Sequence, residues 1–507
     1  LKAMPIMLTG RMLNAKAARQ MGLIDQVVSV HGSLKWAARA AVLKNKRHKA
    51  PGVIQRLVLT GPIRRFLAGQ MRKQTASKVR REHYPAPFEL IDAFEAAGND
   101  SGQMIHLEAE KVPRLLAGET STNLRRVFRL MEQLKAQGKR SRFKAKRVHV
   151  IGAGVMGGDI AAWCALKGLS VTLQDREMKY IEPALERAHQ LFKKKLKKPQ
   201  AVAIAKTRLQ ADPEGAGIER ADVIIEAIFE NLEAKRALFA DLNRRASPKA
   251  ILATNTSAIP LGEIADVLDE PKRLVGLHFF NPVAQMPLVE VVYDTQTDQH
   301  WTDDAASFAT QIGKYALPVT STPGFLVNRV LAPYMRHAMV LHREGISKEA
   351  IDKAAEQFGM PMGPVELADT VGLDVGLGVI DTLMGDRASE DKKALETMVS
   401  QGHLGKKSGQ GFYVWKKGKP QKDRQAHRGH DLDALAARLM APYFAECKSC
   451  LKDGVVANAD LLDAGMIFGT GYAPFRGGPM HTLEKDRPEP LELATMGSDE
   501  PSKETEQ

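Results

Sequence analysis

The chain has 507 residues, of which 44% are hydrophobic and 26% charged, and a formal net charge of +14. This length exceeds what one hydrophobic core holds, so we expect two to four domains of a globular protein, and three cysteines exclude a disulfide framework. With no run of 18 apolar residues, no leader pattern and no S-K-L ending, a bacterial cytoplasmic protein without integral membrane contact is expected.

The positive charge is concentrated in the first part of the chain. Residues 1–150 hold 30 Lys and Arg against 10 Asp and Glu, which leaves 43 against 49 in the remainder. A basic segment can bind nucleic acid, but this one lacks interleaved aromatic residues and any recognised nucleic-acid motif. We therefore predict a solvated basic surface that attracts a phosphate-bearing substrate, and no nucleic-acid partner.

The predicted elements change character along the chain. Residues 1–45 are typical of helix, turn and short strand, and residues 46–142 of a basic helical linker punctuated by prolines. An α/β pattern follows over residues 143–322 and predicts a Rossmann-type domain. Its strands are expected near 148–153, 171–175, 223–228, 251–256 and 274–280. After Gly324 the chain becomes helical, so the fold class is α/β plus all-α.

The helical part contains an internal repeat. LAPYMRHAMVLHREG (331–345) aligns without a gap with MAPYFAECKSCLKDG (440–454), an offset of 109 residues. After a short insertion, residues 348–359 resemble residues 458–469. The shared A-P-Y and the Gly at the helix end indicate a duplication. The predicted parts are therefore a helical domain over 323–416, a second helical repeat over 431–485 and a polar tail over 486–507.

A dinucleotide-binding motif opens the α/β region. Gly152, Gly154 and Gly157 have the spacing G-x-G-x-x-G between a predicted strand and a predicted helix. The first glycine permits a tight turn, the second lets a pyrophosphate approach the backbone, and the third allows close packing of helix on strand. The alternative is a purely structural glycine turn.

An acidic residue follows at the spacing that such a site requires. Asp175 ends the next predicted strand, 23 residues after Gly152, where it would bind ribose hydroxyls and repel a 2′-phosphate. This favours NAD over NADP, although Arg176 follows directly. The alternative is an Asp on the surface.

Two titratable groups lie in the apolar segment GLHFFNPVAQMPLVEVV, namely His278 and Glu290. Oxidation of an alcohol needs a base for the hydroxyl proton, and a His whose second nitrogen is held by a carboxylate suits that role. A turn at Asn281-Pro282 and an antiparallel return would bring the two side chains together. The alternative is a His at a strand end and a Glu facing solvent.

Six motifs together carry a family resemblance. IGAGVMG, IIEAIFENLEAK, ATNTSAIPL, GLHFFNPV, PLVEVV and TPGFLVNRVLAPY resemble, in order and spacing, the L-3-hydroxyacyl-CoA dehydrogenases of fatty-acid β-oxidation. The second helical copy, the linker and LTGRMLNAKAARQMGLIDQVV resemble the bacterial multifunctional β-oxidation α subunit. The resemblance makes residues 1–45 the C-terminal remnant of a crotonase-like domain, and on that basis hydratase activity is not expected.

The resemblance also implies roles for individual residues. His278 is the catalytic base and Glu290 its partner, Ser257 contacts substrate or cofactor near the reacting carbon, and Asn328 contacts the acyl-CoA oxygen. The implied cofactor contacts beyond the three glycines are Met156, Asp175, Glu230, Lys235 and Asn281.

Each of these residues has a structural alternative. Ser257 is a residue type that caps helices, Asn328 could cap a helix or bridge loops, and Glu230 with Lys235 could be an ordinary surface pair. The position equivalent to Asn328 in the second copy is Ala437, so that copy is predicted to be structural. No metal site is expected. Cys447 and Cys450 form a C-x-x-C motif within a predicted helix, but the sequence offers no second pair of ligands near them.

The resulting prediction is NAD-dependent oxidation of (S)-3-hydroxyacyl-CoA to 3-ketoacyl-CoA. The partners implied are an acyl-CoA thioester, a thiolase subunit, and further copies or subunits in an oligomer. Two alternatives stay open, namely a dehydrogenase of small free 3-hydroxy acids and a non-catalytic NAD-binding scaffold subunit.

Overall fold

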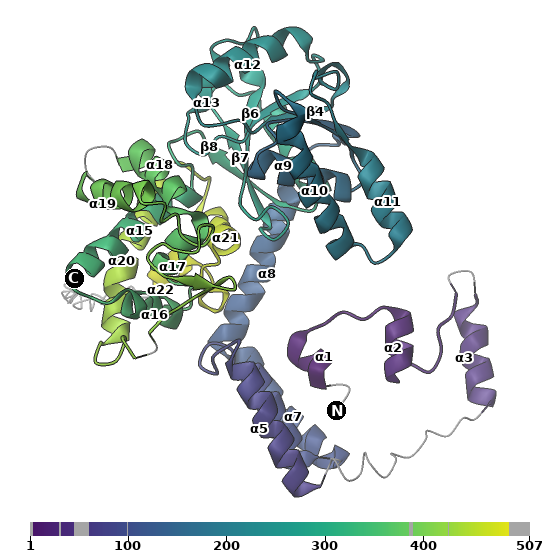
Figure 1. Ribbon diagram of the computed structural model, residues 1–507. Coiled ribbons are helices and arrows are strands. Elements are labelled where there is room, and N and C mark those ends of the chain that lie inside the picture. Colours follow the sequence, from purple (N-terminus) through teal and green to yellow (C-terminus); the bar gives the residue numbers. More distant parts are fainter. Residues whose placement is uncertain are drawn as a thin grey trace, which may run out of the picture. The chain divides into compact units, whose positions relative to one another are not determined.

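The computed structural model describes residues 4–29, 32–44, 60–98, 100–384, 389–423 and 425–485. The chain divides into two units, Leu1–Thr122 and Asn123–Gln507. Figure 1 shows the second unit as an α/β part, in blue and teal, and a helical part, in green to yellow. The fold class predicted from the sequence, α/β plus all-α, is confirmed.

The first unit is helical. Its helices are α1 (Met4–Thr9), α2 (Ala15–Met21), α3 (Leu34–Leu43), α5 (Gly61–Ala76), α6 (Ala86–Ala97) and α7 (Ser101–Ala117). A small apolar cluster joins Met4, Ala68, Ile91 and Phe94. The short strand predicted within residues 1–45 is wrong for the described residues, because 25–29 follow α2 without pairing to any strand. A strand is stable only where a neighbour completes its hydrogen bonds.

One eight-stranded sheet forms the centre of the α/β part, in the order β3-β2-β1-β4-β5-β6-β7-β8. Its pairs are parallel except β6 with β7. The strands are β1 (Arg147–Ile151), β2 (Ser170–Gln174), β3 (Leu209–Ala211), β4 (Val223–Glu226), β5 (Ile251–Thr254), β6 (Leu274–Phe279), β7 (Leu288–Tyr293) and β8 (Tyr315–Thr320). The five strands predicted from the sequence overlap β1, β2, β4, β5 and β6, and β7 is the antiparallel return expected after Asn281-Pro282, while β3 and β8 were not predicted.

Helices cover both faces of this sheet. Alternate strand residues, such as Val223 and Ile224, enter two different apolar clusters, because side chains alternate across a strand. One cluster contains α9 (Val155–Leu166), α10 (Met178–Lys195) and α14 (Gln299–Gln311). The other contains α12 (Leu232–Arg245) and α13 (Leu261–Ala265), and continues into the helical part. The shared core therefore fixes the helical part against the sheet.

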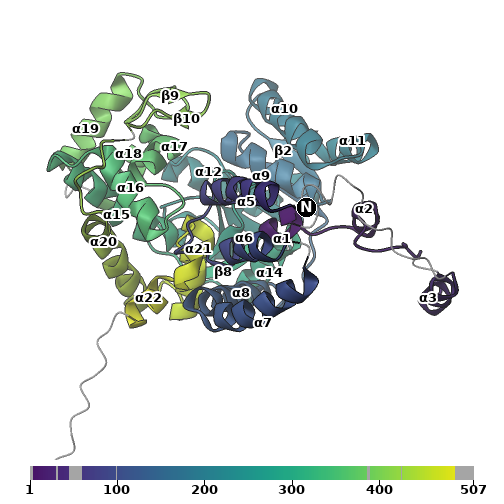
Figure 2. The same cartoon turned by 90° about the horizontal axis from the view of Figure 1, so that it is seen from below.

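The helical part consists of two copies of one unit. The first copy holds α15 (Val327–Arg343), α16 (Lys348–Phe358) and α17 (Pro364–Val371), followed by α18 (Leu373–Met384) and α19 (Ser389–Ser400). The second holds α20 (Leu432–Lys452), α21 (Ala459–Thr470) and α22 (Pro479–Lys485). Helices α15 and α20 lie side by side in both views (Figures 1 and 2). Between the copies, β9 (Trp415–Lys416) and β10 (Lys419–Pro420) form a short hairpin.

The two copies meet at equivalent residues. Tyr334 and Tyr443, which the 109-residue offset aligns, are both buried and contact edge to face at 5.8 Å. The sequence alignment places residue 359 opposite residue 469, but these positions do not correspond, because α16 is capped by Gly359 and α21 by Gly471, both with positive φ. The repeat also includes a third helix. Asp352 accepts a hydrogen bond from the Val365 amide of α17, and Asp463 one from the Met480 amide of α22.

Candidate active site

His278 and Glu290 face each other on neighbouring strands. The antiparallel register of β6 and β7 pairs the two residues directly, and His278 Nδ1 lies 2.7 Å from Glu290 Oε2. The exposed fractions are 4% and 0%, so the pair is shielded from water. Because the carboxylate accepts from Nδ1–H, the lone pair of the neutral imidazole is on Nε2. The sequence alternative, a Glu facing solvent, is wrong.

The second oxygen of Glu290 accepts hydrogen bonds from the start of α15. Oε1 lies 3.1 Å from the Leu326 nitrogen and 2.9 Å from the Val327 nitrogen. These amides lack partners within their own helix, and the helix N-terminus favours negative charge. Phe325 turns the chain into this helix at φ +52°, in the left-handed region, and its ring lies edge-on to His278 at 5.5 Å. Glu290 therefore ties the sheet to the helical part.

Ser257 lies on the other side of the histidine, in the connection between β5 and α13. Its Oγ is 3.2 Å from His278 Nε2, so the hydroxyl donates to the nitrogen that carries the lone pair. The helix-cap alternative is wrong, because α13 begins at Leu261 and its cap residue is Pro260. Ser257 Oγ thus occupies a hydrogen-bonding position at His278 Nε2.

Glu230 and Lys235 are not an ordinary surface pair. Lys235 is 1% exposed, and its Nζ lies 2.6 Å from Glu226 Oε1 and 3.3 Å from Glu230 Oε2. Glu230 Oε1 accepts from the Ser257 amide at 2.9 Å. The pair therefore supports the loop that holds Ser257.

Sequence reasoning missed three residues of this network. Glu226 is fully buried at the end of β4, Thr254 donates to its Oε2 at 2.6 Å, and Thr256 donates to Glu230. The available signal was an acid that closes the otherwise apolar strand VIIE, since a buried carboxylate requires partners. The two threonines flank Asn255 within the motif TNTS and carried no signal of their own.

The glycine loop has the geometry of a dinucleotide cradle. Gly152 has φ +102°, and a Cβ there would lie 2.5 Å from the Ala227 oxygen. A Cβ on Gly157 would lie 1.9 Å from the Gly152 oxygen, whereas one on Gly154 would meet nothing within 4 Å. The loop is thus closed toward the sheet and open at Gly154, where α9 begins. The glycines of this loop and its open side at the N-terminus of α9 fit the pyrophosphate of NAD.

Asp175 follows β2 at the edge of the same loop. Its Oδ2 accepts from the Ala153 amide at 2.7 Å and its Oδ1 from the Arg176 amide at 2.8 Å, which fixes the carboxylate beside the glycine turn. The Arg176 guanidinium lies over the Tyr180 ring at 5.5 Å.

Three further candidates make no hydrogen bond to His278 or Glu290 in the described part of the chain. Met156 is half-buried in the first turn of α9, and Asn281 is exposed two residues after the end of β6. Asn328 is half-buried in the first turn of α15, next to the amide of Val327 that donates to Glu290. The N-cap residue of α15 is Leu326, and no side chain makes a capping hydrogen bond there. The sequence alternative, that Asn328 caps a helix, is therefore wrong for α15.

Lys314 supports the connection between the two strands of the dyad. Its Nζ donates to the Val283 and Met286 carbonyls and lies 4.4 Å from the centre of the Trp163 ring. Burial, together with the charge of Lys167, lowers the pKa of Lys314 to about 8. Sequence reasoning did not single out this residue.

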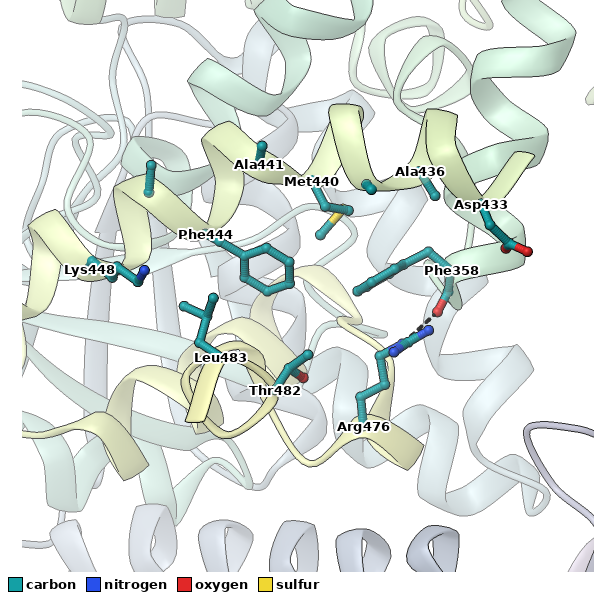
Figure 3. A pocket seen from close by; sticks show the side chains of 12 residues that line it. Phe358, Asp433, Ala436, Met440, Ala441, Phe444, Lys448, Arg476, Thr482 and Leu483 are labelled. Carbon is teal, nitrogen blue, oxygen red and sulfur yellow. Dashed lines mark hydrogen bonds between the residues drawn. The ribbon is translucent and has the colours of Figure 1, made fainter. Parts of the chain in front are cut away.

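A cavity of about 690 Å³ is lined mainly by residues of the second helical copy (Figure 3). Phe358, Met440 and Phe444 line it together with the Arg476 guanidinium, which lies 4.1 Å from the Phe358 ring centre. Ala437, the counterpart of Asn328, also lines it. The cavity holds none of the predicted site residues, so it is not the candidate active site.

Comparisons with known proteins give a consistent result. Residues 147–322 match the family model described as 3-hydroxyacyl-CoA dehydrogenase, NAD binding domain, and residues 324–415 match the C-terminal domain of the same family. In an alignment 515 positions long, the chain is 34% identical to the fatty acid oxidation complex subunit alpha of Shewanella sp. (strain MR-4), covering 95% of this chain and 72% of the relative.

Solved structures agree. The 3-hydroxybutyryl-CoA dehydrogenase of Escherichia coli K12 matches with a TM-score of 0.59 and 27% identity, over 68% of this chain and 92% of that chain. FadB2 of M. tuberculosis matches with a TM-score of 0.50 and 34% identity, over 54% of this chain and 99% of that chain. Among the helices of the described ranges, none has the length and apolar character needed to cross a bilayer.

Proposed function

The chain belongs to the family of fatty acid oxidation complex α subunits, and from that premise we propose how its residues perform the NAD-dependent oxidation of 3-hydroxyacyl-CoA to 3-ketoacyl-CoA. The reaction removes a proton from the C3 hydroxyl and a hydride from C3. The dehydrogenase activity and the NAD requirement follow from family membership, whereas the residue roles below are proposals.

The cofactor is held by the glycine loop and its neighbours. Gly152 and Gly157 let the loop pack closely on itself and on the Ala227 backbone, Gly154 leaves space for the pyrophosphate at the start of α9, and Asp175 binds the ribose hydroxyls. The proposed further contacts are Met156, Glu230, Lys235 and Asn281. When bound, NAD supplies the acceptor for the hydride that leaves C3.

His278 acts as the general base through Nε2. Glu290 holds Nδ1–H, so the imidazole presents its lone pair toward Ser257 and toward the substrate hydroxyl that comes to lie there. Once His278 takes the proton, the imidazolium is stabilised by Glu290, which the two amides of α15 keep in place.

Ser257 and Asn328 hold the substrate oxygen. The Ser257 hydroxyl lies beside Nε2, and Asn328 lies in the first turn of α15, next to Val327, whose amide donates to Glu290. Two donors of this kind favour the carbonyl that develops at C3, because they are fixed before the reaction begins.

The observation that carries these roles is the buried His278–Glu290 pair. The test uses the full chain with NAD and either 3-hydroxybutyryl-CoA or 3-hydroxydecanoyl-CoA, and follows NADH absorbance. We expect the variant His278→Gln to lose kcat by about 10³-fold or more while NAD binding persists. His300→Gln, at an exposed histidine of α14, is the matched control with unchanged kcat. Equal activity of wild type and His278→Gln would remove His278 from the mechanism.

The two sequence alternatives have distinct signatures in the same assay. Preferential turnover of free 3-hydroxy acids would favour the small-acid dehydrogenase, and NAD binding without any turnover would favour the scaffold subunit. The family models and the α subunit relatives support the thioester.

We further propose a thiolase partner, because a 3-ketoacyl-CoA is the substrate of thiolytic cleavage and the relatives are named as subunits of a complex. Light scattering of the full chain, alone and mixed with a purified bacterial thiolase, tests this and reports whether the chain associates with itself. Unchanged masses in the mixture would contradict the proposed partner.

A further inference from the structure

Glu226 is the starting point of a continuous polar chain that ends at His278. It lies at the carboxyl end of β4 and is 0% exposed. Its Oε1 accepts from Lys235 Nζ at 2.6 Å and from the Ile228 amide at 2.8 Å, and its Oε2 accepts from Thr254 Oγ1 at 2.6 Å. None of the proposed catalytic or cofactor roles uses this carboxylate.

Lys235 depends on Glu226 for its position. An ammonium group that is 1% exposed requires an opposite charge and hydrogen-bond acceptors, because desolvation opposes its charge. Its other acid, Glu230, has a side chain that is 39% exposed and lies at the longer distance of 3.3 Å. Glu226 is therefore the fixed partner, and Lys235 transmits its position to Glu230.

Glu230 transmits this position to the site. Its Oε1 accepts from the Ser257 amide at 2.9 Å and from Thr256 Oγ1 at 2.5 Å, and Ser257 Oγ lies 3.2 Å from His278 Nε2. The position of the Ser257 hydroxyl, which faces His278, thus depends on three successive contacts. Glu226 binds Lys235, Lys235 binds Glu230, and Glu230 binds the Ser257 backbone amide.

Glu226 also fixes the wall of the glycine loop. It binds the amide of Ile228, while the Ala227 amide donates to the Ile151 carbonyl at 2.8 Å. The Ala227 oxygen is the atom that a Cβ on Gly152 would approach to 2.5 Å. One buried carboxylate thus contacts the segment beside the cofactor loop and the lysine that supports Ser257.

We propose that Glu226 is a positioning residue of the dehydrogenase, which aligns Ser257 with His278 and sets the wall of the NAD site through Lys235 and Ile228. The inference rests on the proposed roles of Ser257 and His278. Its rival is a purely structural ion pair, whose removal would lower stability without a specific effect on turnover or NAD affinity.

The test compares Glu226→Gln, Lys235→Met and the double variant in the full chain. Glu226→Gln keeps the shape but removes the charge, so we expect a lower thermal midpoint, an NAD Kd raised about five-fold or more, and kcat lowered by about ten- to a hundred-fold. The double variant has no unpaired buried ammonium, so its midpoint returns toward wild type. Its kcat stays impaired, because the link to Glu230 is absent, and its NAD Kd stays raised, because this variant also lacks Lys235, a proposed cofactor contact.

A second comparison separates positioning from stability. Ser257→Ala removes the hydroxyl that the chain positions, so adding Glu226→Gln to it should lower kcat by less than about threefold more. Asp463→Asn disturbs a buried acid paired with Arg126 at 2.7 Å on the second helical copy, and is expected to lower the midpoint with unchanged kcat.

The outcomes separate this inference from the proposed function. Two results would overturn the positioning role. One is that the effects of Glu226→Gln and Ser257→Ala on kcat multiply independently. The other is that the double variant Glu226→Gln/Lys235→Met regains kcat together with its thermal midpoint. If wild type itself does not turn over, the proposed function fails. The NAD Kd, measured by calorimetry, then decides alone, and an unchanged Kd in Glu226→Gln overturns the inference.

Discussion

Glu290 Oε1 lies 2.9 Å from the backbone nitrogen of Val327, and this hydrogen bond joins β7 to the first turn of the helical part. The other oxygen of the same carboxylate holds His278. The orientation of His278, the proposed base, therefore depends on the docking of α15, and changes at either end of this contact should alter turnover.

Glu290→Gln tests this dependence. Glutamine can still accept from the two α15 amides through its oxygen, but its NH₂ group then faces His278 Nδ1, which must give up its proton to accept. The proton moves to Nε2 and blocks the base, so kcat should fall by about 10³-fold or more. The thermal midpoint should stay close to wild type. Steady-state kinetics and scanning calorimetry measure the two quantities, and a kcat within tenfold of wild type would contradict the role.

Ser257→Ala tests the oxygen-holding hydroxyl. The backbone amide that Glu230 binds persists, so we expect no more than about 0.5 kcal/mol change in the free energy of unfolding. The loss of a donor aimed at the developing carbonyl should lower kcat by about ten- to a thousand-fold, with NAD affinity retained. Urea unfolding and calorimetric NAD titration accompany the kinetics. A raised KM with unchanged kcat would argue for substrate binding alone.

Asn328→Ala gives the first helical copy the residue that the second copy has at this position. If Asn328 holds the acyl-CoA oxygen, kcat/KM should fall by about ten-fold or more. The reciprocal variant Ala437→Asn, in the cavity of the second copy, is the matched control and should leave kcat/KM unchanged. Equal effects of the two variants would contradict the assignment of catalysis to the first copy.

Lys314 should make the free energy of unfolding depend on pH in the alkaline range. Its pKa is lowered by burial to about 8 from 10.5, so between these values the unfolded chain binds more protons than the folded one. The free energy of unfolding of wild type relative to Lys314→Met should therefore rise across this window, by up to about 3 kcal/mol. The neutral amine keeps N–H donors for the Val283 and Met286 carbonyls. Urea unfolding at several pH values checks the sign, and a falling difference would refute it.

Tyr334→Phe should stabilise the protein. Within the described residues, the buried Tyr334 hydroxyl has no hydrogen-bond partner, so its removal relieves a desolvation penalty of about 1 kcal/mol. Tyr443→Phe is the symmetry-related control. Its hydroxyl lies 3.4 Å from Thr470 Oγ1, so its removal should be neutral or destabilising. Chemical unfolding midpoints distinguish the two, and a destabilised Tyr334→Phe would show that this hydroxyl has a partner in solution.

Much of the site was predictable because it depends on local spacing. The glycines of residues 152–157 and the acid at Asp175 belong to one strand-turn-helix-strand unit, and its geometry follows from the short distances along the chain. The pairing of His278 with Glu290 likewise spans one antiparallel connection, which the alternation of the two strands already indicates.

The sequence by itself thus determined the fold class, most strands of the sheet and the family to which the site belongs. Only the tertiary structure decided what supports that site: the α15 amides that bind Glu290 are 36 and 37 residues away from it, and Thr254 is 28 residues from Glu226. It also showed that Lys235 is buried and that the short strand expected near the start is absent from the described residues. The physical reason is the same in each case. Burial and the pairing of polar groups depend on which distant segments the core brings together, and no local pattern records that.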